Sequence, residues 1–266
     1  MTAHILTTIL LKAESRWLTA HTPTTIPMPD SKPDLISRIK RKLRQNPFLS
    51  HLIGCPYPAP RWSRCVKRLL YQLAPDTKVL DLGAGNRRRA PNVINLEIET
   101  TPEVDIIADG HLLPFKDDTF DAVISEAVLE HVHSPSIVVS EIYRVLKPGG
   151  YICVAVPFLQ GYHASPHDYQ RWTASGIVQL CAAFTEIESG ACAGPTTALH
   201  WIFREYVGLI CSFGSLLVAK AVSLLVGWLT FPFLILDVLL SRHKDAHILA
   251  SAVYFFGKKE ESVVDY

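Results

Sequence analysis

The chain has 266 residues, of which 48% are hydrophobic and 19% are charged, and its formal net charge at pH 7 is +1. That length accommodates one large or two small domains, and the hydrophobic fraction is sufficient for a buried core. A nearly neutral chain lacks the basic character of obligate nucleic-acid-binding proteins, so we expect no nucleic-acid partner.

The N-terminal region predicts two segments outside the main domain. Residues 1–33 hold one short apolar stretch and a linker rich in proline and threonine, and we expect this segment to be flexible. The apolar stretch is too short and too poorly flanked for a secretory signal. Residues 34–60 form a basic extension, with five Lys or Arg residues at positions 38–44. As a helix it suits an anionic membrane surface, or it presents an ordinary solvated face.

Five apolar runs then follow one another at intervals typical of an α/β sheet. They cover residues 79–82, 93–97, 104–109, 120–125 and 151–158. In an open α/β sheet, ligands bind outside the carboxyl ends of the strands. We therefore expect the polar residues at these ends to converge on one crevice; they are Asp81, Glu97, Asp109 and Ser125.

The motifs around these runs resemble those of the class I S-adenosylmethionine-dependent methyltransferases. They are DLGAG at 81–85, ADGHLLPF at 108–115, FDAVIS at 120–125, VLEHV at 128–132 and RVLKPGG at 144–150. The resemblance covers about residues 65–195 and resumes near the C-terminus. It implies a Rossmann-like, doubly wound sheet with an antiparallel last strand, S-adenosyl-L-methionine as cofactor and a small-molecule substrate.

The resemblance also implies where the cofactor binds. The loop Gly83-Ala84-Gly85 would lie under its methionine part with Asp81 nearby, while Asp109, Gly110 and His111 would border the adenine. Glu97 would accept hydrogen bonds from both ribose hydroxyls, and two carboxylate oxygens do suit a vicinal diol. Alternatively, Glu97 only caps the end of an exposed strand.

The connection after Gly85 departs from the usual family pattern. Only seven residues, NRRRAPN at 86–92, precede the next apolar run, too few for the helix that normally joins parallel strands. We expect an extended link, which Pro91 favours. Arg87, Arg88 or Arg89 would then supply positive charge for a ligand anion, or the three arginines form a solvated loop.

The segment after the fifth run, residues 157–173, is dense in polar and aromatic side chains. It resembles a methyltransferase subgroup with a shortened first crossover and a PF...H..P.DY.R.T pattern. We expect His163 and His167 to be catalytic, since histidine is the first candidate for a base. The remaining candidates are His131, His133, Glu126 and Glu130. In a purely structural alternative, Asp168 pairs with Arg171 and Thr173 caps a helix that starts near Ala174.

A nearly uncharged stretch, residues 206–236, interrupts the domain and contains Lys220 as its one charged side chain. We expect a hydrophobic helical insertion at 201–244 within a methyltransferase domain formed by residues 61–200 and 245–260. Residues 248–257 predict a last strand, antiparallel beside a strand at about 183–190. If both strands belong to one cytosolic sheet, the insertion must enter and leave the membrane on the same side. It is then a re-entrant or in-plane membrane hairpin, or a soluble lid over an apolar pocket or a dimer partner.

The six cysteines include no Cys-x-x-Cys pair and no histidine at zinc-ligand spacing, so we expect reduced thiols and no metal site. The predicted function is methyl transfer to a small or amphipathic, lipid-like substrate at the cytoplasmic face of a membrane, or otherwise in the cytoplasm. A nicotinamide-dependent oxidoreductase is disfavoured because Arg88 replaces the third glycine of its fingerprint. A non-catalytic membrane scaffold with a vestigial cofactor-binding fold is the alternative.

Overall fold

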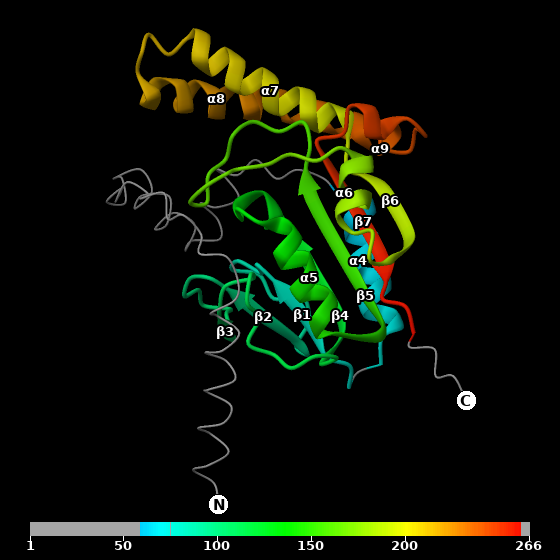
Figure 1. Ribbon diagram of the computed structural model, residues 1–266. Helices are drawn as coiled ribbons and strands as arrows, with labels where there is room; N and C mark the ends of the chain where they lie inside the picture. Colours follow the sequence, from blue (N-terminus) through cyan, green and yellow to red (C-terminus); the bar gives the residue numbers. More distant parts are fainter. Residues whose placement is uncertain (1–58, 75, 262–266) are drawn as a thin grey trace, which may run out of the picture. The chain divides into compact units, whose positions relative to one another are not determined.

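A seven-stranded sheet forms the centre of the computed structural model, in which residues 59–74 and 76–261 are described (Figure 1). The strands are β1 Val79–Leu82, β2 Val93–Glu97, β3 Ile106–Ile107, β4 Phe120–Glu126, β5 Leu146–Pro157, β6 Thr185–Ala193 and β7 Ala252–Lys258. Their order is β3-β2-β1-β4-β5-β7-β6. Strands β1 to β5 pair in parallel, and β7 is antiparallel to both of its neighbours. The predicted Rossmann-like sheet with an antiparallel last strand is therefore confirmed.

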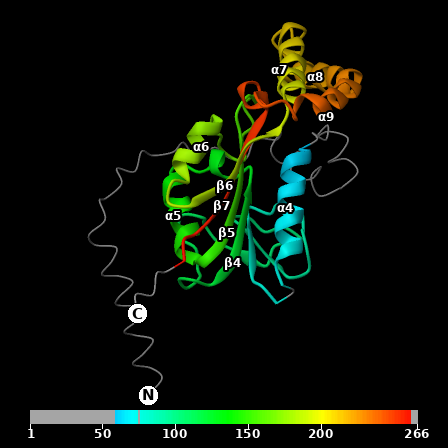
Figure 2. The same ribbon diagram turned by 90° about the vertical axis from the view of Figure 1, so that its right-hand side faces the viewer.

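Helices cover both faces of the sheet (Figure 2). Helix α4, Pro60–Gln72, lies on one face, while α5, Pro135–Val145, and α6, Ala174–Leu180, lie on the other. The helices bury apolar residues at helical spacing because that spacing places them on one stripe. The buried stripe of α4 is Trp62, Cys65, Val66 and Leu69, and that of α5 includes Val138, Val139, Ile142 and Val145.

Three strands differ in length from the predicted runs. Strand β3 has two residues where six were expected, and just before it the Asp105 side chain accepts from the Asn95 backbone N–H at 2.8 Å. Strand β5 starts at Leu146, ahead of the predicted position 151, and pairs irregularly near Phe120. Strand β7 starts at Ala252, because residues 246–248 form a 3₁₀ turn, η3 Ala246–Ile248.

No helix joins β1 to β2, as the short connection predicted. Arg88 holds this link in place of a crossover helix: its guanidinium donates to the Val93 and Glu103 carbonyls, each at 2.9 Å. The buried Asn95 amide donates to the carbonyls of Arg87 and Glu103. Side-chain donors thus satisfy backbone acceptors that a helix would satisfy internally.

A helical hairpin stands between β6 and β7 and extends past the end of the sheet at which β5 terminates (Figure 1). It consists of α7 Pro195–Ile210, α8 Leu216–Thr230, η2 Phe231–Leu236 and α9 Asp237–Leu240. The insertion begins at Pro195, six residues before the predicted start at 201, since Asp237 caps the N-terminus of α7 by accepting from the Thr196 and Thr197 amides. The register pairs Ala193 with Ala252, so the chain returns beside the point where it left.

One helical stretch, Leu216–Leu240, is long and apolar enough to cross a membrane by length and composition, with a mean hydropathy of 2.1 and 22% of its most apolar window buried. The predictions for residues 1–33 and for nearly all of 34–60 lie outside the described residues. The five described cysteines are free, and four of them are buried. They agree with the expectation of reduced thiols, whereas Cys55 falls outside the described residues.

Candidate functional site

The glycine loop after β1 and the end of β2 meet as the sequence predicted. Gly83 and Gly85 have φ angles of +75° and +63°, a left-handed conformation that glycine adopts at little cost. The Gly85 N–H donates to the Glu97 carboxylate at 2.5 Å, and the Gly83 N–H donates to the Leu96 carbonyl at 2.8 Å. Among the described residues there is open space beside Gly85, since an added Cβ atom would meet none of their non-neighbouring atoms within 4 Å.

Asp109, Gly110 and His111 form a second group, directly after β3. The Asp109 carboxylate accepts from the His111 backbone N–H at 2.9 Å and lies 2.6 Å from the His111 ring nitrogen Nδ1. Partial burial raises the pKa of Asp109, but these contacts outweigh it, so the pKa lies below its ordinary value. The group borders the end of β1, because a Cβ atom at Gly110 would lie 3.6 Å from the Leu82 side chain.

Asp81 does not stand open beside the loop; it is buried in an ion pair with Arg89 at 2.7 Å. Arg89 also donates to Glu126, the last residue of β4, at 2.8 Å. Burial raises the pKa of Asp81, and the Arg89 guanidinium offsets this only in part. Burial also acts on Glu126, but Arg87 and Arg89 lower its pKa below the ordinary value.

The three arginines therefore form ion pairs with carboxylates of the protein itself. Arg87 pairs with Glu126 at 3.0 Å, and Arg88 pairs with Glu103 and Asp105. Arg89 is nearly buried in its ion pairs, whereas the Arg87 and Arg88 side chains stay partly exposed, and whether any of the three contacts a ligand anion stays a prediction. Their carboxylate partners lie outside the short segment and could not be read from it.

The residues at the strand ends fit the cofactor that the sequence motifs imply. Asp81 Oδ1 and Ser125 Oγ are buried and have no hydrogen-bond partner among the described residues, so they are available to a ligand. Glu97 presents its carboxylate beside the open space at Gly85. A glycine loop without side chains, a carboxylate and buried polar atoms without partners together fit a ligand that carries an amino-acid part and a ribose.

A cavity of about 140 Å³ lies next to this region, between α4 and the ends of β4, β5 and β6. Its polar lining comes from Glu126, Glu130 and Gln160, and its apolar lining includes Trp62 and Pro157. Glu126 also belongs to the ion-pair chain Asp81–Arg89–Glu126, which links the cavity lining to the end of β1, just before the glycine loop. A small acceptor group bound here would lie beside the carboxyl ends of the parallel strands.

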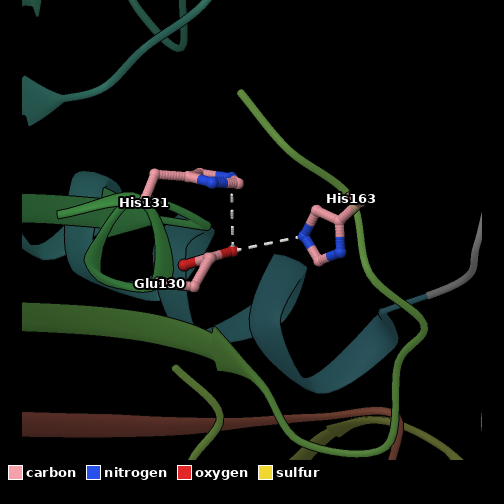
Figure 3. A group of neighbouring side chains, drawn as sticks. All are labelled: Glu130, His131 and His163. Carbon is pink, nitrogen blue, oxygen red and sulfur yellow. Dashed lines mark ion pairs between the residues drawn. The ribbon is translucent and has the colours of Figure 1, made fainter. Parts of the chain in front are cut away.

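Glu130, His131 and His163 gather beside this cavity (Figure 3). Glu130 and His131 belong to the 3₁₀ turn η1, Leu129–His131, and His163 comes from the loop after β5. One oxygen of Glu130, Oε1, lies 3.8 Å from Nε2 of His131 and 3.6 Å from Nε2 of His163. Burial lowers the pKa of His163, but the carboxylates of Glu130 and Asp168 outweigh it, and the pKa lies above its ordinary value.

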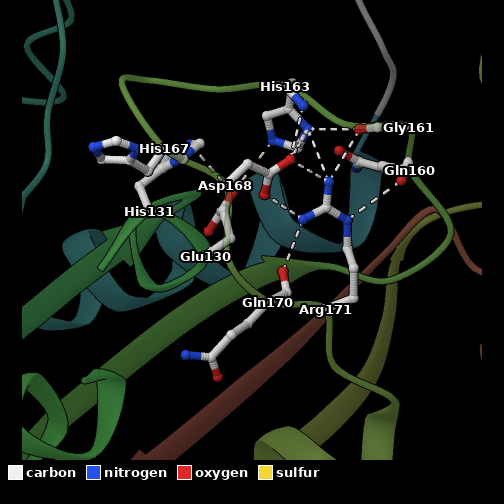
Figure 4. A network of polar contacts seen from close by, with 9 residues as sticks. All are labelled: Glu130, His131, Gln160, Gly161, His163, His167, Asp168, Gln170 and Arg171. Atoms are coloured by element: carbon white, nitrogen blue, oxygen red, sulfur yellow. Dashed lines mark hydrogen bonds and ion pairs between the residues drawn. The ribbon is translucent and has the colours of Figure 1, made fainter. Parts of the chain in front are cut away.

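Asp168 and Arg171 anchor the loop that carries His163 (Figure 4). The carboxylate of Asp168 accepts from Arg171 Nη2 at 2.6 Å and from the His163 backbone N–H at 2.7 Å. Arg171 also donates to the Gly161 carbonyl. The Thr173 hydroxyl accepts from the Gly176 amide and caps α6. The structural interpretation of Asp168, Arg171 and Thr173 matches these contacts.

The structure separates the two predicted catalytic histidines. The His167 ring lies tilted against the Tyr169 ring and points away from the Glu130 carboxylate, and its backbone carbonyl joins the network as acceptor for His131 Nδ1 (Figure 4). His133 lies instead against the His111 ring, with ring centroids 4.4 Å apart. The side chain that completes the cluster is His131, whose neighbour Glu130 supplies the carboxylate.

Part of the chain is similar to known methyltransferases. A family model described as a methyltransferase domain matches residues 66–154. A demethylmenaquinone methyltransferase of Renibacterium salmoninarum is 33% identical over 112 residues, which are 36% of this chain and 47% of that protein. An uncharacterized methyltransferase of Schizosaccharomyces pombe is 41% identical over 59 residues, which are 22% of this chain and 21% of that protein.

The crystal structure of the [4+2]-cyclase SpnF matches with a TM-score of 0.50 and 17% identity, over 84% of this chain and 95% of that one, and shows the fold. The chain spans less than half the length of the two curated relatives named above. From the strand order, the matched motifs and these similarities it follows that the chain carries a domain of the class I S-adenosylmethionine-dependent methyltransferase family.

Proposed function

We propose that this protein transfers a methyl group from S-adenosyl-L-methionine to an amphipathic, lipid-like acceptor at a membrane surface. The observation that carries the first half is the loop Gly83–Gly85 beside the Glu97 carboxylate, with open space at Gly85. The second half rests on the exposed apolar surface of the α7–α8 hairpin, which stands at the same end of the sheet (Figure 1).

In this proposal the strand ends hold the cofactor. Glu97 accepts from the ribose hydroxyls, the backbone of Gly83, Ala84 and Gly85 lies along the methionine part, and Asp109 with Gly110 and His111 borders the adenine. Ser125 and the free oxygen of Asp81 supply further polar contacts. The bound cofactor supplies an already activated methyl group, so the protein's main task is to position the acceptor.

The hairpin has small residues between its helices and large apolar residues on its outer surface, the reverse of the arrangement usual in a water-soluble protein. Its inner seam is made of small residues: Gly208 of α7 faces Ala219 and Ser223 of α8, and Gly227 lies one turn further along. Its outer surface is made of large apolar ones, including Ile202, Phe203, Tyr206, Leu209, Phe213, Leu217, Leu225 and Leu229. Small residues inside and large apolar residues outside are typical of helix pairs in lipid.

Polar groups limit how deeply the hairpin would enter a membrane. Glu205 of α7 pairs with Lys220 of α8 at 2.8 Å and accepts from Ser223. Such a pair in the middle of the hairpin favours an in-plane or re-entrant position over a full crossing. The pairing of Ala193 with Ala252 agrees, because both ends of the insertion belong to one sheet edge. The domain would thus stay on one side, the cytoplasmic face.

Trp201 connects the hairpin to the site. This residue of α7 lies with its ring centroid 5.5 Å from that of His163, and its Nε1 would be 2.7 Å from a Cβ atom at Gly161. A membrane-bound hairpin would therefore hold the loop of His163 near the bilayer. An acceptor such as the substrate named for the demethylmenaquinone methyltransferase, with an apolar tail and a polar head, suits this arrangement.

Two alternative functions of the protein make different predictions. A non-catalytic scaffold with a vestigial fold would bind membranes without turnover. A protein with the cyclase's fold but another reaction would bind cofactor without transferring its methyl group. Incubation of the full chain with methyl-labelled cofactor and the lipid extract of its own host membranes tests all three. We expect label in the lipid fraction, and unlabelled lipids despite bound cofactor would contradict methyl transfer.

Liposome flotation tests the membrane half. Phe213 at the hairpin tip is 94% exposed and Leu217 is 81% exposed, so their replacement by aspartate removes membrane contacts without cost to the core. We expect the Phe213→Asp, Leu217→Asp double variant to lose binding by roughly 100-fold, since each side chain contributes about 1.5 kcal/mol or more when buried. Tyr71→Asp is the matched control, because Tyr71 on α4 is 93% exposed. If the double variant floats like the parent, the hairpin is instead a lid or a dimer surface.

A further inference from the structure

The cluster of Glu130, His131 and His163 has the composition and the spacing of a metal site. Two imidazole nitrogens and one carboxylate oxygen lie within 4.8 Å of one another. Both Nε2 atoms face the same oxygen, at 3.6 and 3.8 Å. Ligands of a tetrahedral zinc ion at about 2.0–2.2 Å stand roughly 3.3–3.5 Å apart, so the two oxygen–nitrogen distances are a few tenths of an ångström too long, and all three atoms lie within 4.8 Å of one another.

The two rings are held in the orientation that ligation requires. His131 Nδ1 lies 2.6 Å from the His167 carbonyl, and His163 Nδ1 lies 2.9 Å from the Gly161 carbonyl. A carbonyl only accepts hydrogen bonds, so His131 Nδ1 carries a proton, and in its neutral form this ring presents a bare Nε2. His163 Nδ1 lies between the Gly161 carbonyl and, at 3.3 Å, the Arg171 Nη2 donor, and its Nε2 also faces the Glu130 carboxylate. Hydrogen bonds of this kind from the second ring nitrogen are usual for histidines that bind metals.

Glu130 supplies an independent observation. Its side chain is 0% exposed, and neither carboxylate oxygen has a hydrogen-bond partner among the described residues. A fully buried carboxylate without hydrogen bonds is costly, and buried charges are normally paired or coordinate metals. A cation at the centre of the cluster would satisfy the carboxylate and both Nε2 atoms that face it.

We propose that Glu130, His131 and His163 bind a divalent transition-metal ion, with zinc as the best match. Three protein ligands leave a coordination position open, as in catalytic zinc sites. Glu130 also lines the cavity beside β4 and β5, so the open position faces the space where an acceptor would bind. Only this last step rests on the proposed function: an oxygen of the acceptor would take the open position and be oriented there. His163 then affects turnover as a ligand.

Metal binding is measured on the full chain, freed of metal by a chelator, in the absence of cofactor and acceptor. We expect one equivalent of Zn²⁺ to bind tightly, and Co²⁺ in its place to give visible absorption bands of a protein-bound, nitrogen-ligated ion. Loss of a group that only supports a ligand already costs 10–100-fold in affinity, so Glu130→Gln and His163→Ala should each lose roughly 100-fold or more.

His167→Ala is the matched control, since it lies on the same loop, its ring points away and its backbone carbonyl still anchors His131. It should bind Zn²⁺ like the parent. Failure of the parent to bind, or equal binding by the parent, Glu130→Gln and His163→Ala, overturns the site and assigns any bound ion to other side chains.

Circular dichroism shows which variants are folded. Should Glu130→Gln not fold, the Co²⁺ spectrum of His163→Ala decides, because a spectrum identical to the parent's contradicts ligation. Methyl transfer is not measured in these titrations. An enzyme that binds Zn²⁺ but transfers no methyl group refutes the proposed function and leaves the metal site standing, and the reverse result refutes only the site.

Discussion

At the scale of single residues, the two glycines of the loop after β1 have different tasks. Both have positive φ angles, but a Cβ atom at Gly83 would lie 2.1 Å from the Val128 side chain, whereas one at Gly85 would meet only open space among the described residues. Gly83 thus permits close packing inside the protein. Gly85 keeps clear the space that we assign to the cofactor.

Alanine substitutions separate these tasks. Gly83→Ala combines backbone strain with a steric clash and should cost clearly more folding stability than Gly85→Ala, which carries about 1–2 kcal/mol of strain alone. Gly85→Ala should instead lose cofactor affinity while losing no more folding stability than this strain. Urea unfolding and calorimetric cofactor titration measure the two effects. Unchanged cofactor affinity in Gly85→Ala would contradict our placement of the cofactor.

Arg89 is the residue whose role differs most from what its position in the sequence suggested. Its side chain is 10% exposed and lies between Asp81 and Glu126. Arg89→Met would leave two partly or fully buried carboxylates without their shared cation, a change that typically costs about 3–5 kcal/mol. Urea unfolding should show this loss, while Arg87→Met, at a half-exposed position, should stay within about 1 kcal/mol of the parent. Equal effects would contradict the assigned role of Arg89.

The predicted cofactor residues whose placement at one end of the sheet agrees with the structure follow a strand directly. Glu97 ends an apolar run, and its place at a strand's carboxyl end follows from the alternation of strands and loops alone. The cluster of Glu130, His131 and His163 could not be found in this way, because His163 lies 32 positions after His131 on a loop folded back over η1. Only the anchoring of that loop by Asp168 and Arg171 brings them together.

At the scale of elements, a latch on α5 holds the segment that leads from the adenine group to β4. Arg144 donates to both oxygens of Glu141, each at 2.7 Å, and to the carbonyls of Leu113 and Phe115. Glu141 in turn accepts from the Leu113 amide at 2.8 Å. The helix and the segment after Gly110 are therefore joined through one ion pair that is mostly buried.

This latch predicts a pH dependence. The hydrogen bonds from Arg144 lower the pKa of Glu141 below its ordinary value of 4.5. Its stabilisation is therefore complete above that value and is lost as pH falls through the lower pKa of the folded state. Glu141→Gln should cost about 1.5–3 kcal/mol at pH 7, and its difference from the parent should shrink below pH 4.5. Urea unfolding at several pH values measures the difference in folding stability between the variant and the parent. If this difference does not change with pH, the latch is contradicted.

The sequence predicted which elements exist better than it predicted where they end. Counting residues between Gly85 and Val93 was enough to exclude a crossover helix. At the two-residue β3 and at the start of α7 at Pro195, single side chains, Asp105 and Asp237, bind backbone N–H groups of distant or neighbouring elements. Such tertiary contacts leave no periodic signal in the sequence.

At the scale of the whole molecule, the described residues join a cofactor-binding sheet to an apolar hairpin at one edge. The sequence predicted this combination from a nearly uncharged stretch between two strands of one sheet, and the pairing of Ala193 with Ala252 places the two ends of the insertion side by side. The link between the parts runs through Trp201. Trp201→Ala should reduce methyl transfer to lipids by roughly 10-fold or more while cofactor affinity stays unchanged, as remote positioning contacts can do. Parallel losses of both would indicate a structural role.

The most direct test of the account is a calorimetric titration of the full chain with S-adenosyl-L-methionine. We expect one equivalent to bind and Glu97→Gln to lose roughly 10–100-fold in affinity, because hydrogen bonds to a charged group contribute about 1.5–3 kcal/mol. Glu99→Gln, two residues further on and exposed, should bind like the parent. Absence of binding by the parent, or equal affinity of the parent and Glu97→Gln, would contradict a methyltransferase site at the end of β2.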